Sequence, residues 1–99
     1  MKIRSELYVL FDDEIARMKL EFWGRRVFIH YLAKASPLRV ARRALRVAAD
    51  VKRICAAIGY KTIEALFRDN ERLERLCVLW GFALVRKQEG LTYMRCENA

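Results

Sequence analysis

Apolar and polar residues alternate along the first third of the chain, a pattern typical of β-strands that bury one face. The alternation predicts strands over residues 6–11, 15–23 and 26–32, with an acidic turn between the first two. Gly24 stands first in the two-residue turn before the third strand, as a type II′ hairpin requires. We therefore expect the chain to begin with three antiparallel strands.

A different period, close to 3.6 residues, begins at Leu38 and continues to Ile58. Apolar residues recur on one side of this period and basic residues lie mostly on the other, which indicates an amphipathic helix that ends at Gly59. Ser36 and Pro37 precede the pattern. We expect the serine oxygen to cap the first turn and the proline to occupy the first helical position.

A strand over residues 60–67 follows this helix after a short link. Parallel strands need a crossover connection, usually a helix, and such crossovers are nearly always right-handed. We therefore expect this strand to pair with strand 26–32 in a βαβ unit.

A second helix is predicted from Asp69 or Asn70, either of which can cap its first turn. Gly81 is expected to end the helix in the left-handed conformation, and Phe82 to fold back onto the last turn. The apolar stripe between these ends consists of Leu73, Leu76, Cys77 and Trp80.

The last two predicted strands cover residues 82–87 and 91–97, around a turn at residues 88–90. The complete order is βββαβαββ, which predicts an α+β fold with a twisted, mostly antiparallel sheet and two helices. At 99 residues the chain is long enough for one modest core. We expect a single domain over residues 1–99.

The composition narrows the possible partners. A hydrophobic content of 55% with 32% charged residues is that of a globular chain, and no apolar run reaches the roughly 18 residues of a membrane span. The first residues do not resemble a signal peptide, so we expect a cytoplasmic protein with no membrane partner. The net charge of +8 attracts acidic surfaces, nucleic acid or a phosphorylated cofactor.

The three cysteines, Cys55, Cys77 and Cys96, are widely spaced and lie in apolar stretches. Their odd number and their spacing suggest neither a disulfide framework nor a zinc site. We expect reduced thiols in the core and no bound metal.

Few side chains offer catalytic chemistry. His30 is the only histidine and has no carboxylate beside it in the sequence, which is typical of a structural strand residue. Glu21 and Glu64 are interpreted as solvent-facing residues or cross-strand partners. Trp23 and Trp80 are interpreted as core or rim residues, with base-stacking platforms as the alternative.

Basic residues recur at helical spacing along the long helix and predict one positively charged stripe. This stripe could contact the phosphates of coenzyme A or of nucleic acid, since each contact needs only a cation near an anionic oxygen. The alternative is a solvated outer face. The stripe contains Arg39, Arg42, Arg43, Arg46, Lys52 and Arg53.

The second helix carries a resemblance to a known family. Its starting Asn70, its apolar stripe and its closing Gly81 and Phe82 are similar to the last helix of the GNAT superfamily of acyl-CoA-dependent N-acetyltransferases. The order of elements also resembles a GNAT domain from its second strand to its end, over nearly the whole chain. The family's first strand and first two helices, which help to wall the acceptor-substrate cleft, have no counterpart.

The resemblance implies where a cofactor would bind. The family's glycine-containing pyrophosphate loop corresponds to the start of the long helix at Arg39, Val40, Ala41 and Arg42, and the cofactor-contacting asparagine corresponds to Asn70. Side chains of Val40 and Arg42 stand where glycines would be and are expected to obstruct the cofactor. Cys77 takes the position of the family's general-acid tyrosine, and His30 lies where members sometimes place a general base, so these two are the catalytic candidates.

We expect from these departures a GNAT-like protein that has lost acetyl transfer, needs no cofactor and acts by binding. It resembles the GNAT-like proteins of tailed phages, which implies a virion structural or head-assembly component with protein partners or a homo-oligomer. One alternative is a small N-acetyltransferase that uses acetyl-CoA. Another is a basic nucleic-acid-binding module that uses Arg39, Arg42, Arg43 and Arg46.

Overall fold

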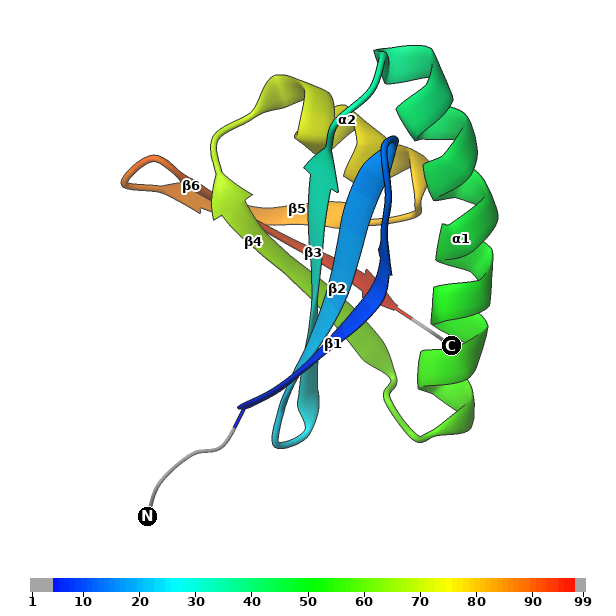
Figure 1. Ribbon diagram of the computed structural model, residues 1–99. Coiled ribbons are helices and arrows are strands. Elements are labelled where there is room, and N and C mark those ends of the chain that lie inside the picture. The colour runs from blue at the N-terminus through cyan, green and yellow to red at the C-terminus, as the bar shows by residue number, and fades with distance from the viewer. Residues whose placement is uncertain (1–4, 98–99) are drawn as a thin grey trace.

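The computed structural model describes the backbone of residues 5–97 and their side chains, except those of residues 5, 37 and 41. Within this range six strands and two helices follow in the order that the sequence predicts (Figure 1). Their bounds are β1 Ser5–Asp12, β2 Ala16–Trp23, β3 Arg26–Ala33, α1 Pro37–Ala57, β4 Thr62–Arg68, α2 Glu71–Leu79, β5 Ala83–Gln88 and β6 Leu91–Glu97.

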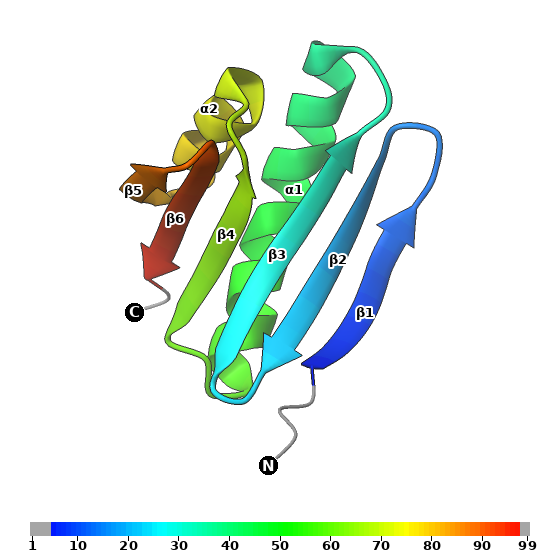
Figure 2. The same ribbon diagram turned by 90° about the vertical axis from the view of Figure 1, so that its left-hand side faces the viewer.

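The strands form one mixed sheet in the order β1-β2-β3-β4-β6-β5. Every neighbouring pair is antiparallel except β3 and β4, which are parallel, so the expected α+β class and the parallel pair are confirmed. Both helices lie on the same side of the sheet, and the other side is not covered by any element of residues 5–97 (Figure 2). We call this uncovered side the open face.

The hairpin between β2 and β3 sets the register on which the open face depends. The strands pair without a shift from Ala16 and Ala33 to Trp23 and Arg26. Gly24 has a φ of 57°, as expected for the first turn position. Because side chains alternate between faces, this register decides which residues of β2 and β3 meet on the open face.

The caps of the two helices differ. Ser36 precedes α1 but its side chain makes no capping hydrogen bond, so the predicted serine cap is wrong, although proline does stand in the first turn. The Asn70 side chain accepts a hydrogen bond from the amide of Leu73 at 3.1 Å and caps α2 as predicted.

The predicted end of α2 is confirmed. Gly81 has a φ of 93°, and the amide of Phe82 donates to the carbonyl of Cys77 at 2.9 Å, the pattern of a Schellman motif. Tyr60 makes the equivalent bond at the end of α1, to Cys55. Tyr60 therefore belongs to the helix end, and β4 begins at Thr62, two residues later than predicted.

The core lies between the helices and the covered face of the sheet. It contains Met18 and Leu20 from β2, Val27 and Ile29 from β3, and Met94 from β6, packed against the buried sides of α1 and α2. The three cysteines are free and buried there, as expected. Burial raises the pKa of Cys77 to about 12.

Neither helix within residues 5–97 combines the length and the apolar character that crossing a membrane requires.

Candidate functional site

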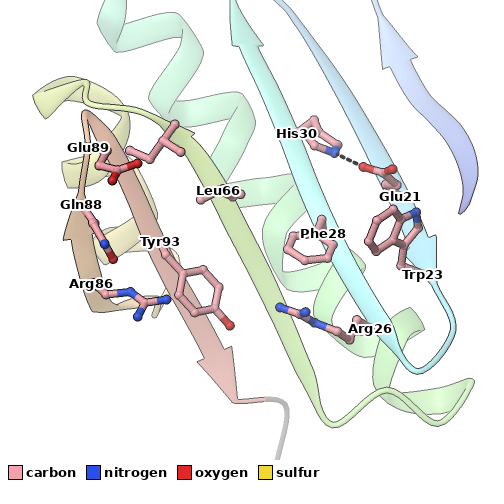
Figure 3. Close-up of a pocket in the computed structure, with 11 residues that line it drawn as sticks. Glu21, Trp23, Arg26, Phe28, His30, Leu66, Arg86, Gln88, Glu89 and Tyr93 are labelled. Carbon is pink, nitrogen blue, oxygen red and sulfur yellow. Dashed lines mark hydrogen bonds and ion pairs between the residues drawn. The ribbon is translucent and has the colours of Figure 1, made fainter. Parts of the chain in front are cut away.

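A hollow of about 630 Å³ occupies the open face across β2, β3, β4, β5 and β6. Figure 3 shows its side chains projecting from the strands toward the viewer, with none contributed by a helix. Its walls combine aromatic and charged groups, among them Trp23, Arg26, Phe28, His30, Arg86 and Tyr93. These residues come from strands far apart in the sequence, so the hollow exists only once the sheet has formed.

A buried carboxylate lies beneath one side of this hollow. Glu64 is 4% exposed although it belongs to the open face, because Arg26 and Tyr93 cover it. The Arg26 guanidinium donates two hydrogen bonds to the carboxylate, at 2.8 and 2.5 Å, and the Tyr93 hydroxyl donates a third. These contacts hold the pKa of Glu64 below its ordinary value, with the Arg26 hydrogen bonds as the main cause.

The same contacts affect both partners of Glu64. The ion pair raises the pKa of the Arg26 guanidinium, while burial and the carboxylate together raise the pKa of Tyr93. All three groups therefore keep their neutral-pH protonation state, Glu64 ionised and the other two protonated. This cluster fixes the floor of the hollow and is not suited to exchange protons near pH 7.

A second polar pair lies higher on the open face. His30 Nε2 and Glu21 Oε1 are 2.8 Å apart, and both side chains are partly exposed (Figure 3). The β2–β3 register pairs Lys19 with His30 and Glu21 with Phe28, so Glu21 and His30 are diagonal neighbours. The interpretation of Glu21 as a cross-strand partner is confirmed, and His30, which has no carboxylate beside it in the sequence, receives one from the neighbouring strand.

Aromatic and cationic groups lie together beside the turn between β2 and β3. The Arg26 guanidinium lies over the Phe28 ring, 4.9 Å from its centroid. Trp23 beside them is 44% exposed, which places it at the rim of the hollow and not in the core. The open face thus presents an indole ring and a guanidinium plane next to each other.

A smaller cavity lies where β3 and β4 separate. These strands pair at a single position, Phe28 with Glu64, and diverge toward their C-terminal ends (Figure 2). The space between them, which we call the wedge, has a volume of about 110 Å³ and is lined by His30, Tyr31, Cys77 and Trp80 among others. The Tyr31 and Trp80 rings meet edge to face there, with centroids 5.3 Å apart.

The predicted cofactor residues are only partly arranged as expected. Both helices start at the same end of the sheet, which brings Asn70 and the first turn of α1 to one side of the molecule (Figure 2). Val40, however, is 5% exposed and packs in the core, so its side chain does not obstruct the helix start. Arg39 and Arg42 are exposed, and the Ala41 side chain lies outside the described part of the chain.

The basic stripe of α1 is divided between internal contacts and solvent. Arg43 pairs with Asp13 at 2.6 Å and lies 4.7 Å from the Phe11 centroid, while Lys52 donates a hydrogen bond to the carbonyl of Trp80. The prediction of one continuous stripe is therefore wrong at these two positions. Arg46 joins Arg39 and Arg42 on the exposed part of the helix.

The two catalytic candidates meet only at the wedge. His30 and Cys77 both line it, but Cys77 is almost fully buried and its high pKa keeps the thiol protonated. Within residues 5–97 no group of three or more His, Cys, Asp and Glu side chains is placed to hold a metal ion.

Comparison of the chain with known protein families, curated protein sequences and solved structures found no match.

Proposed function

We propose that the chain is a GNAT-like domain that has lost acetyl transfer and acts as a binding component of a larger assembly. The order of elements, the parallel crossover through α1 and the helix from Asn70 to Gly81 support the GNAT-like topology. In the setting that the resemblance indicates, the assembly is a phage head or virion. Fold alone does not determine function, so the proposal depends on the sites described above.

The small volume of the wedge is the main observation that supports the proposed loss of acetyl transfer. Cys77 stands at the position of the family's general acid, and the thiol end of a cofactor would have to enter the wedge to approach it. Sites for small ligands typically have volumes of about 300–1,000 Å³. The wedge offers about 110 Å³ and is bounded by the Tyr31 and Trp80 rings, which supports the proposal that a pantetheine arm does not enter it.

The free edges of the sheet support a role in assembly. β1 and β5 are the outer strands, and each leaves one row of main-chain groups unpaired within the sheet. β5 is exposed at all six of its positions, including Leu84 and Val85. An exposed strand with apolar side chains is a template for pairing with another chain, so we propose that a second copy or a protein partner joins at β5.

Two measurements test this function. Titration of the chain with acetyl-CoA in a calorimeter should give no binding heat at millimolar ligand, and micromolar affinity would contradict the loss of the cofactor site. Light scattering should show association that increases with concentration. Val85→Lys should prevent that association, whereas Val78→Lys, at an exposed valine of α2, should not. A monomer at every concentration would refute self-association.

One observation favours the enzymatic alternative. The Glu21 carboxylate orients His30, an arrangement that a general base requires, and His30 borders both the large hollow and the wedge. The first turn of α1 also lacks a side-chain cap and an acidic residue, and Arg39 and Arg42 are exposed beside it, which suits an anionic phosphate.

An acyltransferase of this kind would need a partner to complete its acceptor wall. It predicts acetyl-CoA turnover that falls with His30→Ala and survives Cys77→Ala. Absence of turnover in the presence of candidate amines and of protein partners would refute the enzymatic alternative.

A further inference from the structure

The open face is not used by the edge contacts proposed for assembly, and its chemistry indicates a separate partner. We propose that the open face binds single-stranded nucleic acid, with bases stacked on Trp23 and on the Arg26 guanidinium and phosphates held by cations at the two ends of the face. This inference concerns a different surface from the proposed assembly edge and does not depend on it.

Both stacking groups are exposed, and Arg26 is also held in place. Trp23 presents an indole ring at 44% exposure, and Arg26 is fixed by its two hydrogen bonds to Glu64 while its guanidinium lies 4.9 Å from the centroid of the Phe28 ring. Unpaired bases stack on aromatic rings and on arginine planes, whichever base is present. A guanidinium already oriented by a buried carboxylate loses little freedom when a base is added.

The charges of the open face are suited to a polyanion. Its strand carboxylates are paired, Glu21 with His30, Glu64 with Arg26 and Glu97 with Arg95. Among the cations of the same face that form no ion pair within residues 5–97 are Arg17, Lys19 and Arg86. Glu89, in the turn after β5, is the acidic group at the far rim of the hollow.

The shape of the face suits an extended strand. A second hollow of about 440 Å³, lined by Arg17, Lys19 and Leu32 among others, adjoins the first and shares Glu21 and His30 with it. Together the two hollows cross the sheet from β1 to β5, with Arg17 and Lys19 toward one end and Arg86 toward the other. The cations therefore flank the stacking groups along one continuous path.

Single strands fit this surface better than a duplex. Stacking on Trp23 and Arg26 requires bases that are not already paired and stacked. Both helices lie on the other side of the sheet, so no helix of residues 5–97 projects from the open face to enter a major groove. An acidic protein segment would satisfy the cations but would leave the stacking groups without a partner.

The experiment measures binding of fluorescein-labelled oligothymidine and oligouridine to the full chain by anisotropy, over a range of salt concentrations. Three neutralised phosphates give a slope of log K against log salt of about −2, at about 0.7 per phosphate for single strands. Intrinsic fluorescence supplies a second signal, because the chain has two tryptophans and Trp80 is only 2% exposed. Quenching on binding should therefore come from Trp23 and vanish in Trp23→Phe.

Matched variants locate the site. Trp23→Ala should weaken binding roughly 5- to 150-fold, the range for removing one stacking partner, while Trp23→Phe should retain most of the affinity. Lys19→Gln and Arg86→Gln should each reduce the salt slope by about 0.7. Arg42→Gln and Arg46→Gln, which remove equal charge from the exposed stripe of α1, should leave both affinity and slope unchanged. Circular dichroism confirms that each variant is folded.

Several results would overturn the inference. These are no binding at 50 mM salt, equal competition by polyglutamate, equal affinity for a duplex of the same length, or loss of binding in the α1 variants while Trp23→Ala binds normally. Val85 lines neither hollow, and Val85→Lys keeps both stacking groups, so nucleic-acid binding by that variant separates failure of this inference from failure of the proposed assembly.

Discussion

Lys52 reaches from the C-terminal third of α1 to the end of α2, where its ammonium donates a hydrogen bond to the main-chain carbonyl of Trp80. The carbonyls at the C-terminal end of a helix carry partial negative charge and lack partners within the helix. A cation from the neighbouring helix therefore satisfies one of them and links the two helices on the covered side of the sheet.

Lys52→Met should accordingly destabilise the protein, because it keeps the apolar stem but removes the charged donor. We expect a loss of about 1.5–3 kcal/mol in the free energy of unfolding, the range for hydrogen bonds that involve a charged group. Urea denaturation measures it. Arg53→Met is the control, since Arg53 forms only an exposed pair with Asp50, and its change should stay within about 0.5 kcal/mol.

Gly81→Ala should be more costly than Gly59→Ala. Both glycines end a helix with positive φ, 93° and 98°, so each alanine is strained by about 1 kcal/mol. An alanine Cβ at position 81 would in addition lie 2.8 Å from the Lys52 ammonium, whereas nothing lies within 4 Å at position 59. Relieving this contact requires Lys52 to move away from the Trp80 carbonyl, which is the reason for the extra cost. Thermal denaturation compares the two variants, and equal destabilisation would contradict the prediction by showing that Lys52 moves aside without cost.

Glu64→Gln should change how stability depends on pH. The pKa of Glu64 is lowered in the folded protein from its ordinary value of 4.5, so its ion pair contributes stability above that value. This contribution is lost as pH falls from 4.5 through the lower folded value.

The variant should therefore be less stable than the wild type at pH 7, by about 1–3 kcal/mol, and the difference should shrink toward pH 3. Urea denaturation across this range measures both chains. Glu97→Gln is the control, because Glu97 forms only an exposed contact with Arg95, and a difference for Glu64→Gln that does not vary with pH would refute the linkage.

Cys77 should resist alkylation in the folded protein. Burial raises its pKa to about 12, and at neutral pH the thiolate fraction falls on the order of a thousandfold below that of an ordinary cysteine. Iodoacetamide labelling followed by mass spectrometry should modify Cys77 only after unfolding in urea. Val78→Cys introduces an exposed thiol beside it for comparison, and equal labelling of both sites in the folded chain would contradict the buried position.

The order and the approximate bounds of the elements could be predicted because they depend on local signals. Alternation identified β2 and β3, and Asn70 and Gly81 marked the two ends of α2 through caps that involve only nearby residues. The Ser36 cap failed although its sequence signal is equally good, since a preference for capping does not fix where the hydroxyl points.

Contacts between elements were harder to predict. The Glu21–His30 pair follows from the register of one hairpin. It could have been predicted from the sequence, because the Gly24 turn sets which residues become diagonal neighbours. Lys52 appeared to belong to a solvated stripe, and only the position of α2 gives it a partner. Val40 faces the core because the packing of α1 on the sheet decides which side of the helix is buried. The residues at the start of the helix do not by themselves indicate which side that is.

The single paired position between β3 and β4 divides the sheet into two halves, β1-β2-β3 and β4-β6-β5. Each half is held by antiparallel ladders, which are unbroken in β2–β3 and β4–β6 and shifted once in β1–β2 and in β5–β6, while a single pair at Phe28 and Glu64 joins the halves. Because few main-chain hydrogen bonds join the halves there, amide hydrogens at this junction should exchange faster than those of the β2–β3 and β4–β6 ladders in a hydrogen-exchange measurement. The Arg26–Glu64 ion pair crosses the same junction and links the two halves through side chains.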